Sequence, residues 1–116
     1  MNSINLIDFY KVSHRVQYPT GTEMVYSNWT PRKSRTSINE VVFFGLQYFI
    51  KHYLIDDFNR NFFHKPKNEV INKYKRRLEN ALGAGCITYE HIEALHNKQY
   101  LPIKIKALPE GTLCPI

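Results

Sequence analysis

The sequence predicts an α+β fold, with helices packed on a small, incomplete sheet of mixed or antiparallel strands. Three observations predict it. Apolar residues recur at helical spacing between residues 69 and 82, apolar and charged side chains alternate along residues 101–108, and turns rich in glycine and proline separate the segments. With 116 residues, of which 43% are hydrophobic and 14% aromatic, the chain fits one globular domain spanning residues 1–116.

The N-terminal segment predicts a short helix over residues 6–15. Tyr10 and His14 are four positions apart and share a helical face, while Asp8 lies in the first turn, where a carboxylate favours the helix dipole. Residues 18–21 (Tyr-Pro-Thr-Gly) then end the helix, because they hold both residues that most strongly interrupt regular structure.

The middle of the chain predicts a strand followed by a long helix. Residues 24–29 (MVYSNW) have strand-like composition and alternation. Ser37 and Glu40 have the Ser-x-x-Glu spacing of a capping box, which predicts a helix running to about Leu54. Since that helix is apolar on most sides, we expect it to be the central buried helix. Gly45 inside it suggests a close packing contact.

Two further helical segments follow. We expect residues 56–63 to add a helical piece and the helix over residues 69–82 to end at Gly83. Its apolar stripe comprises Val70, Tyr74, Leu78 and Leu82. Thr88 can cap another short helix that extends to about Asn97.

The C-terminal segment predicts two strands. Residues 101–108 (LPIKIKAL) place isoleucines on one face and lysines on the other. Residues 109–111 (Pro-Glu-Gly) form a turn, and residues 112–116 begin a second strand for which the sequence offers no evident partner.

Charge and composition narrow the classes of function. The net charge is +6 and the pI about 9.4, and six basic residues lie between positions 65 and 77. They could contact phosphates of a nucleic acid, but the apolar stripe on the same helix favours a solvated outer face, so we expect no nucleic-acid partner. The longest apolar run, near residues 41–46, is far shorter than the roughly 20 residues of a membrane span. With no secretory signal pattern, we expect a cytoplasmic protein without membrane contact, in which Cys86 and Cys114 are reduced thiols.

The spacings typical of common catalytic and metal sites do not occur. The sequence has no GxGxxG, P-loop, HExxH or GxSxG pattern, and its five histidines are scattered. We therefore expect no catalytic residue, metal site or cofactor within this chain.

Three segments resemble the nicotinamide phosphoribosyltransferase family, in the same order and at compatible separations. Residues 8–14 (DFYKVSH), continuing through Gln17-Tyr18-Pro19 to Tyr26, resemble the opening segment of the family. Residues 42–48 (VFFGLQY) are similar to its F-x-G-L-Q helix, and residues 101–111 (LPIKIKALPEG) to its L-P-I-x-I-K-A-x-P-E-G strand and turn.

The resemblance implies the N-terminal domain of a type II phosphoribosyltransferase that condenses nicotinamide with phosphoribosyl pyrophosphate in NAD salvage. Family members are homodimers, and the N-terminal domain of one subunit contributes to a nicotinamide pocket in the barrel of the other. By this resemblance Tyr10 stacks on the pyridine ring, Asp8 lies beside it and Arg32 lies near the phosphate-binding region. The substrate-binding residues are therefore expected to be Tyr10, Asp8 and Arg32.

The chain also departs from the family, whose members are several times longer. The resemblance places the phosphoribosyl pyrophosphate loops and the groups that act with Mg²⁺ in a catalytic barrel that these 116 residues do not contain. Three interpretations stay open: a domain or fragment completed by a barrel-containing chain, a stand-alone domain that docks on an intact enzyme and modulates it, and a basic nucleic-acid-binding domain. We expect the first, with no turnover by this chain alone.

Overall fold

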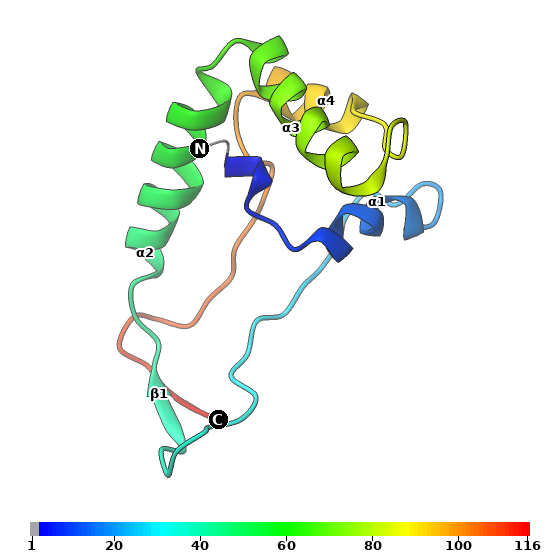
Figure 1. Ribbon diagram of the computed structural model, residues 1–116. Coiled ribbons are helices and arrows are strands. Elements are labelled where there is room, and N and C mark those ends of the chain that lie inside the picture. Colours follow the sequence, from blue (N-terminus) through cyan, green and yellow to red (C-terminus); the bar gives the residue numbers. More distant parts are fainter. Residues whose placement is uncertain (1–2) are drawn as a thin grey trace. The chain divides into compact units, whose positions relative to one another are not determined.

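The computed structural model describes residues 3–116, which form two compact units (Figure 1). The first unit comprises the N-terminal residues up to Asp8 together with residues 47–104, and the second comprises residues 9–46 and 105–116. The described residues confirm the α+β class, since they combine helices with a two-stranded antiparallel sheet.

The first unit is helical and holds the hydrophobic core. A helical run begins with α2 (Leu46–Phe49) and continues through the π-type segments η3 (Ile50–Asp57) and η4 (Asn59–Phe63). After a short connector come α3 (Lys67–Leu82) and α4 (Glu90–Lys98), and the short 3-10 helix η1 (Ser3–Asn5) packs against both α3 and η4. The helices predicted over residues 56–63, 69–82 and 88–97 are thus confirmed to within a few residues.

The buried apolar side chains come from η4, α3 and α4. Phe62 is completely buried, and its ring meets those of Phe63 and His96 edge-on at centroid distances of 5.1 and 5.3 Å. From the predicted stripe of α3, Val70, Tyr74 and Leu78 are buried, whereas Leu82 is half exposed. The buried core consists of Phe62, Phe63, Val70, Ile71, Tyr74, Leu78 and Ile92.

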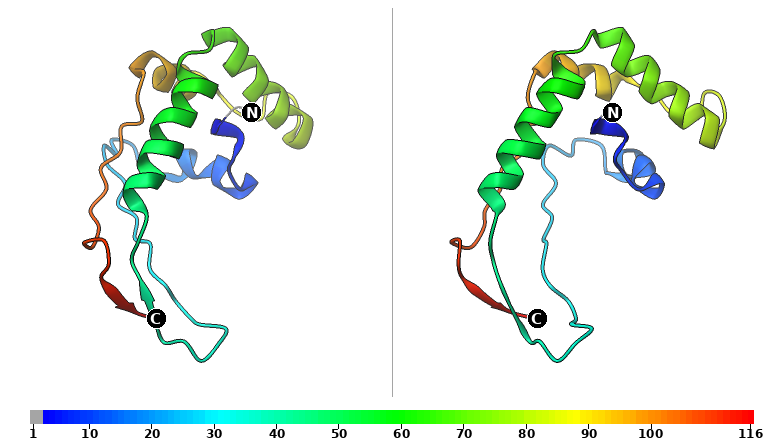
Figure 2. Two further views of the ribbon diagram at one scale, coloured as in Figure 1. Left: turned by 90° about the vertical axis from the view of Figure 1, so that its left-hand side faces the viewer. Right: turned by 60° about the vertical axis from the view of Figure 1, so that its left-hand side comes forward.

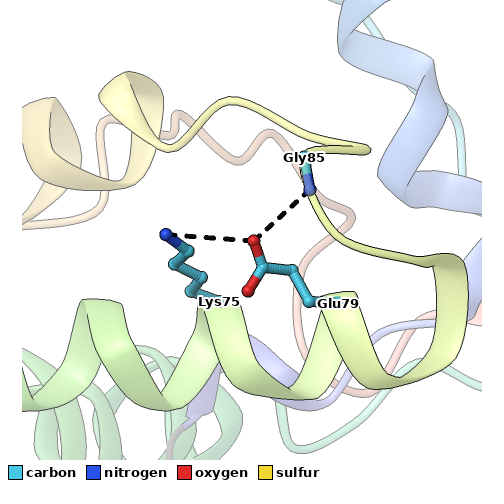
Figure 3. A network of polar contacts seen from close by, with 3 residues as sticks. All are labelled: Lys75, Glu79 and Gly85. Atoms are coloured by element: carbon cyan, nitrogen blue, oxygen red, sulfur yellow. Dashed lines mark hydrogen bonds and ion pairs between the residues drawn. The ribbon is translucent and has the colours of Figure 1, made fainter.

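Polar contacts fix the turn that follows α3 (Figure 3). The Glu79 carboxylate lies 3.8 Å from the Lys75 ammonium and accepts a hydrogen bond of 3.5 Å from the Gly85 amide. Gly83, at φ +98°, ends the helix as predicted, because this backbone conformation favours glycine. α4 begins at Glu90, two residues after Thr88, and Tyr89 stands at its N-cap position without a side-chain capping hydrogen bond. The predicted cap by Thr88 stays a prediction.

The second unit contains two short helices and the sheet. The 3-10 helix η2 (Phe9–Ser13) leads directly into α1 (His14–Gln17), in place of the single helix predicted over residues 6–15. β1 (Glu40–Val42) pairs antiparallel with β2 (Leu113–Pro115), with Val41 opposite Cys114. The final strand therefore has a partner, which the sequence did not reveal. Cys86 and Cys114 are not joined by a disulfide.

Two predicted strands are absent from the described residues. Residues 24–29 and 101–108 are extended but belong to no sheet, as the ribbon in both views of Figure 2 shows. A strand also needs a hydrogen-bonded neighbour, and within residues 3–116 neither segment has one.

The predicted capping box is also wrong, because Glu40 begins β1 rather than a helix. The β-branched pair Val41-Val42 favours a strand, and β2 supplies its partner. The helical run starts only at Leu46, just after Gly45. At Gly45, φ is +89° and an added Cβ would meet no atom within 4 Å, so this glycine serves the backbone turn and not the close packing we expected.

The helix expected to be central and buried is largely exposed. No residue of α2 or η3 is buried, and Tyr48, Phe49 and Tyr53 keep about half or more of their surface exposed. These rings pack on one another, and Tyr48 stacks on His52 at 5.2 Å with an interplanar angle of 9°. The core forms instead where η4, α3 and α4 meet.

Candidate functional site

Tyr10 lies on η2, and its ring has two neighbours that follow it in the chain. The His14 ring meets it edge-on at 5.5 Å, and the Lys11 ammonium lies 5.7 Å from its centroid. The side chain is 64% exposed, so much of the aromatic surface is open to a flat ligand. A cation near the ring and an exposed face are both compatible with stacking on an electron-poor heterocycle.

Hydrogen bonds hold the turn that carries Tyr10. Ser13 Oγ donates to the Tyr10 carbonyl oxygen at 3.0 Å, and Gln17 Nε2 donates to Ser13 Oγ at 2.9 Å. The residues of the opening motif therefore have local roles: His14 packs against the Tyr10 ring, and Gln17 supports its backbone through Ser13. Their spacing keeps these side chains on one side of the short helices η2 and α1.

Asp8 and Arg32 are both exposed. Asp8 ends the N-terminal segment of the first unit, two positions before Tyr10 in the chain. Arg32 lies in the extended segment between α1 and β1, and within residues 3–116 it makes no hydrogen bond, ion pair or ring contact. The structure brings Tyr10 together with His14 and Lys11, and within residues 3–116 no contact joins Tyr10 to Arg32. The roles of Asp8 and Arg32 stay predictions.

Sequence reasoning missed one long-range contact of the second unit, made by Glu110. Its two carboxylate oxygens accept hydrogen bonds from the backbone amides of Gly45, at 2.6 Å, and Leu46, at 2.8 Å. The strand pairing continues beside this contact, since Phe43 exchanges backbone hydrogen bonds with Gly111 and Thr112. Glu110 thus caps the start of the helical run from 65 positions away along the chain. In the sequence, the sign of this role is the position of Glu110 within the P-E-G turn motif.

Two tyrosines of the helical unit, Tyr74 and Tyr89, have raised pKa values. Burial raises the pKa of Tyr74 above its ordinary value. Burial also raises the pKa of Tyr89, and the nearby Glu79 carboxylate adds to this effect because it disfavours the phenolate.

Within the described residues 3–116, no three or more His, Cys, Asp or Glu side chains are grouped so that they could hold a metal ion. In the same range, no helix is long and apolar enough to cross a membrane.

Comparison with known proteins decides the family. Residues 2–105 match the sequence model of the nicotinamide phosphoribosyltransferase N-terminal domain. The chain belongs to this family. It is also 54% identical, over 118 aligned positions, to a nicotinamide phosphoribosyltransferase of Acinetobacter baylyi. That match covers 97% of this chain and 23% of the relative, so the chain spans about a quarter of the relative's length. No solved structure matches the chain.

Proposed function

We propose that this chain acts as the N-terminal domain of a nicotinamide phosphoribosyltransferase, which joins nicotinamide to phosphoribosyl pyrophosphate and releases pyrophosphate and nicotinamide mononucleotide. The observation that carries the proposal is the 54% identity to the Acinetobacter baylyi enzyme across nearly the whole chain. At this identity, a domain with a different role would be unusual. The partner is then a barrel-containing chain that supplies the other groups of the site, in a homo-oligomer.

In this function Tyr10 supplies an aromatic face for the pyridine ring of nicotinamide. Its ring is exposed, and the hydrogen bonds from Gln17 through Ser13 hold its backbone in place. A preorganised ring loses less conformational freedom when it binds a ligand, and stacking contributes about 0.5–1.5 kcal/mol beyond the area buried.

Asp8 and Arg32 complete this part of the pocket. The carboxylate of Asp8 accepts a hydrogen bond from the carboxamide of nicotinamide and disfavours the anionic nicotinate, which explains a preference for the amide. Arg32 is exposed, and its planar fork of donors suits phosphate oxygens. The chain alone has no turnover in this proposal, because the groups that stabilise the separating ribosyl cation and pyrophosphate lie in the barrel. Mg²⁺ enters there with phosphoribosyl pyrophosphate.

A chimera tests the proposal. In it, this chain replaces the matching quarter of the Acinetobacter baylyi enzyme, and production of nicotinamide mononucleotide is measured beside that of the chain alone. The chimera should be active and the isolated chain inactive. An inactive but folded chimera would contradict the proposal, as would turnover by the isolated chain.

Tyr10→Ala in the chimera tests the stacking role. Loss of 0.5–1.5 kcal/mol should raise KM for nicotinamide about 2- to 13-fold. Tyr10→Phe keeps the ring and should stay near the parent value. Tyr100→Ala is the matched control, because Tyr100 is similarly exposed, at 57%, and lies outside the three motif segments. If Tyr10→Ala leaves KM unchanged, or shifts it no more than Tyr100→Ala, the stacking role is wrong.

A further inference from the structure

Lys11 gives the Tyr10 ring a positively charged neighbour. The Lys11 ammonium lies over the ring, 5.7 Å from its centroid. The His14 ring contacts Tyr10 edge-on, and the tyrosine side chain is still 64% exposed. The electron-rich face of an aromatic ring attracts cations. One cation of this chain therefore already lies at the ring on which nicotinamide stacks in the proposed function.

The proposed reaction changes the charge of the stacked ligand. The N1 lone pair of neutral nicotinamide forms the bond to the ribose C1, while the C1–O bond breaks and pyrophosphate leaves with its electron pair. The ring of the product is therefore a pyridinium cation. A tyrosine face without a cation beside it would bind this product ring more tightly than the neutral substrate, because cation–π attraction adds to stacking. Tyr10 alone would thus favour retention of the product.

We propose that Lys11 is a specificity-determining residue, which lets Tyr10 stack on neutral nicotinamide and disfavours the cationic ring of the product. The inference rests on the proposed function, because it needs nicotinamide on Tyr10. The Lys11 ammonium repels a second cation and competes for the same ring electrons, whereas an uncharged ring meets no such repulsion. Lys11 therefore promotes release of the product.

The distance between the charges sets the size of the effect. A pyridinium stacked on the opposite face of the Tyr10 ring at ~3.5 Å would lie ~9 Å from the Lys11 ammonium. Repulsion between two unit charges at that distance weakens binding about 2-fold with the screening of water and about 20-fold with that of a protein surface. Because Tyr10 and Lys11 are both exposed, we expect about 2- to 5-fold.

Two probes of similar shape and different charge test this assignment. Nicotinamide is neutral, and N1-methylnicotinamide carries the pyridinium charge without the ribose phosphate. In the chimera with the Acinetobacter baylyi enzyme, Lys11→Gln should lower the inhibition constant of N1-methylnicotinamide about 2- to 5-fold and change KM for nicotinamide by less than about 1.5-fold. Lys11→Arg keeps the charge and should behave like the parent. An inhibition constant that stays the same or rises in Lys11→Gln would overturn the proposal, as would an equal change for both probes.

Salt separates repulsion between charges from a structural effect. The parent's preference for nicotinamide over N1-methylnicotinamide should shrink as salt rises from about 0.01 M to 1 M, because the Debye length falls from about 30 Å to about 3 Å. In Lys11→Gln the preference should not shrink. Lys106→Gln is the matched control, because it removes the charge of another exposed lysine of the second unit and should follow the parent. A shift in Lys106→Gln equal to that in Lys11→Gln would refute the assignment.

NMR of the isolated chain decides the question if the chimera does not fold. A probe that stacks on Tyr10 shifts the signals of its ring protons, even when binding is weak. Relative to nicotinamide, N1-methylnicotinamide should shift these signals more steeply in Lys11→Gln than in the parent chain. Equal relative slopes in the two chains, including the absence of any shift, would overturn the proposal.

Tyr10→Ala separates a failure of this inference from a failure of the proposed function. If Tyr10→Ala raises KM for nicotinamide while Lys11→Gln leaves the selectivity unchanged, the stacking role remains and the role of Lys11 is wrong. If the chimera is folded but inactive, and the isolated chain still shows the charge selectivity at Tyr10, the selectivity remains and the proposed function is wrong.

Discussion

Replacing Glu110 by alanine should destabilise the junction between β1 and the helical run that starts at Leu46. The substitution removes both acceptors of the hydrogen bonds from the Gly45 and Leu46 amides, of 2.6 and 2.8 Å. Hydrogen bonds to a charged group contribute about 1.5–3 kcal/mol when buried. This site is exposed, so water can solvate the released amides, and the range measured for helix N-caps, about 0.5–2 kcal/mol, is the appropriate scale. We expect a loss near 1–2 kcal/mol.

The loss should be local, because the buried core lies in the first unit while Glu110 lies in the second. Hydrogen exchange followed by NMR is therefore a better assay than global unfolding. A change of 1–2 kcal/mol corresponds to a decrease of about 5- to 30-fold in the protection of the Gly45 and Leu46 amides. Glu110→Gln keeps one oxygen acceptor and should lie between the parent and Glu110→Ala.

Glu23→Ala is the matched control. Glu23 is an exposed glutamate of the same unit that makes no hydrogen bond or ion pair within the described residues, so its removal should change protection by less than about 0.5 kcal/mol. If Glu110→Ala leaves both amides as protected as in the parent, or if Glu23→Ala has the same effect, the carboxylate is not the cap of this helix.

Two predictions concern the core of the first unit. Phe62→Ala should cost about 3–5 kcal/mol in denaturant unfolding because Phe62 is fully buried, whereas Phe49→Ala, at a half-exposed ring, should cost much less; similar losses would contradict the assigned core. Burial raises the pKa of Tyr74, so as pH rises the unfolded chain loses this phenolic proton before the folded chain does. The contribution of Tyr74 to stability is therefore fully present below its ordinary pKa of about 10, and it should be lost as pH rises through the raised pKa of the folded chain. Tyr74→Phe should flatten this alkaline loss in unfolding measured from about pH 9 to 11, and an unchanged slope would show that Tyr74 titrates like an exposed tyrosine.

Helices whose buried side chains form a local pattern could be predicted from the sequence. The stripe of Val70, Tyr74 and Leu78 is a local pattern, and the glycine at position 83 marks its end, so α3 follows from nearby residues alone. The same holds for α4. Each pattern lies within one helix. In α3 the structure buries three of the four predicted inner side chains, while Leu82 at the helix end is half exposed.

Structure that depends on distant residues could not be predicted in the same way. The Ser37-x-x-Glu40 spacing suggested a helix start, but the pairing of Val41 with Cys114 made a strand there. The carboxylate that caps the helical run belongs to Glu110, at the other end of the chain. Residues 24–29 show the reverse case: their composition predicts a strand, yet a strand forms only when a neighbour exists. Periodicity reports local preference and carries no information about which distant segment supplies the partner.

The three family-like segments therefore differ in what they do for this chain. The second and third segments meet each other: Phe43 pairs with Gly111 and Thr112, and Glu110 caps Gly45 and Leu46. This shared structural junction is enough to explain why the two segments occur together. The first segment is different, because its hydrogen bonds and ring contacts converge on the exposed Tyr10. If ligand binding explains any of the three motifs, it should be this one, so substitutions in the first segment should alter KM for nicotinamide, whereas those at Glu110 should act first on stability.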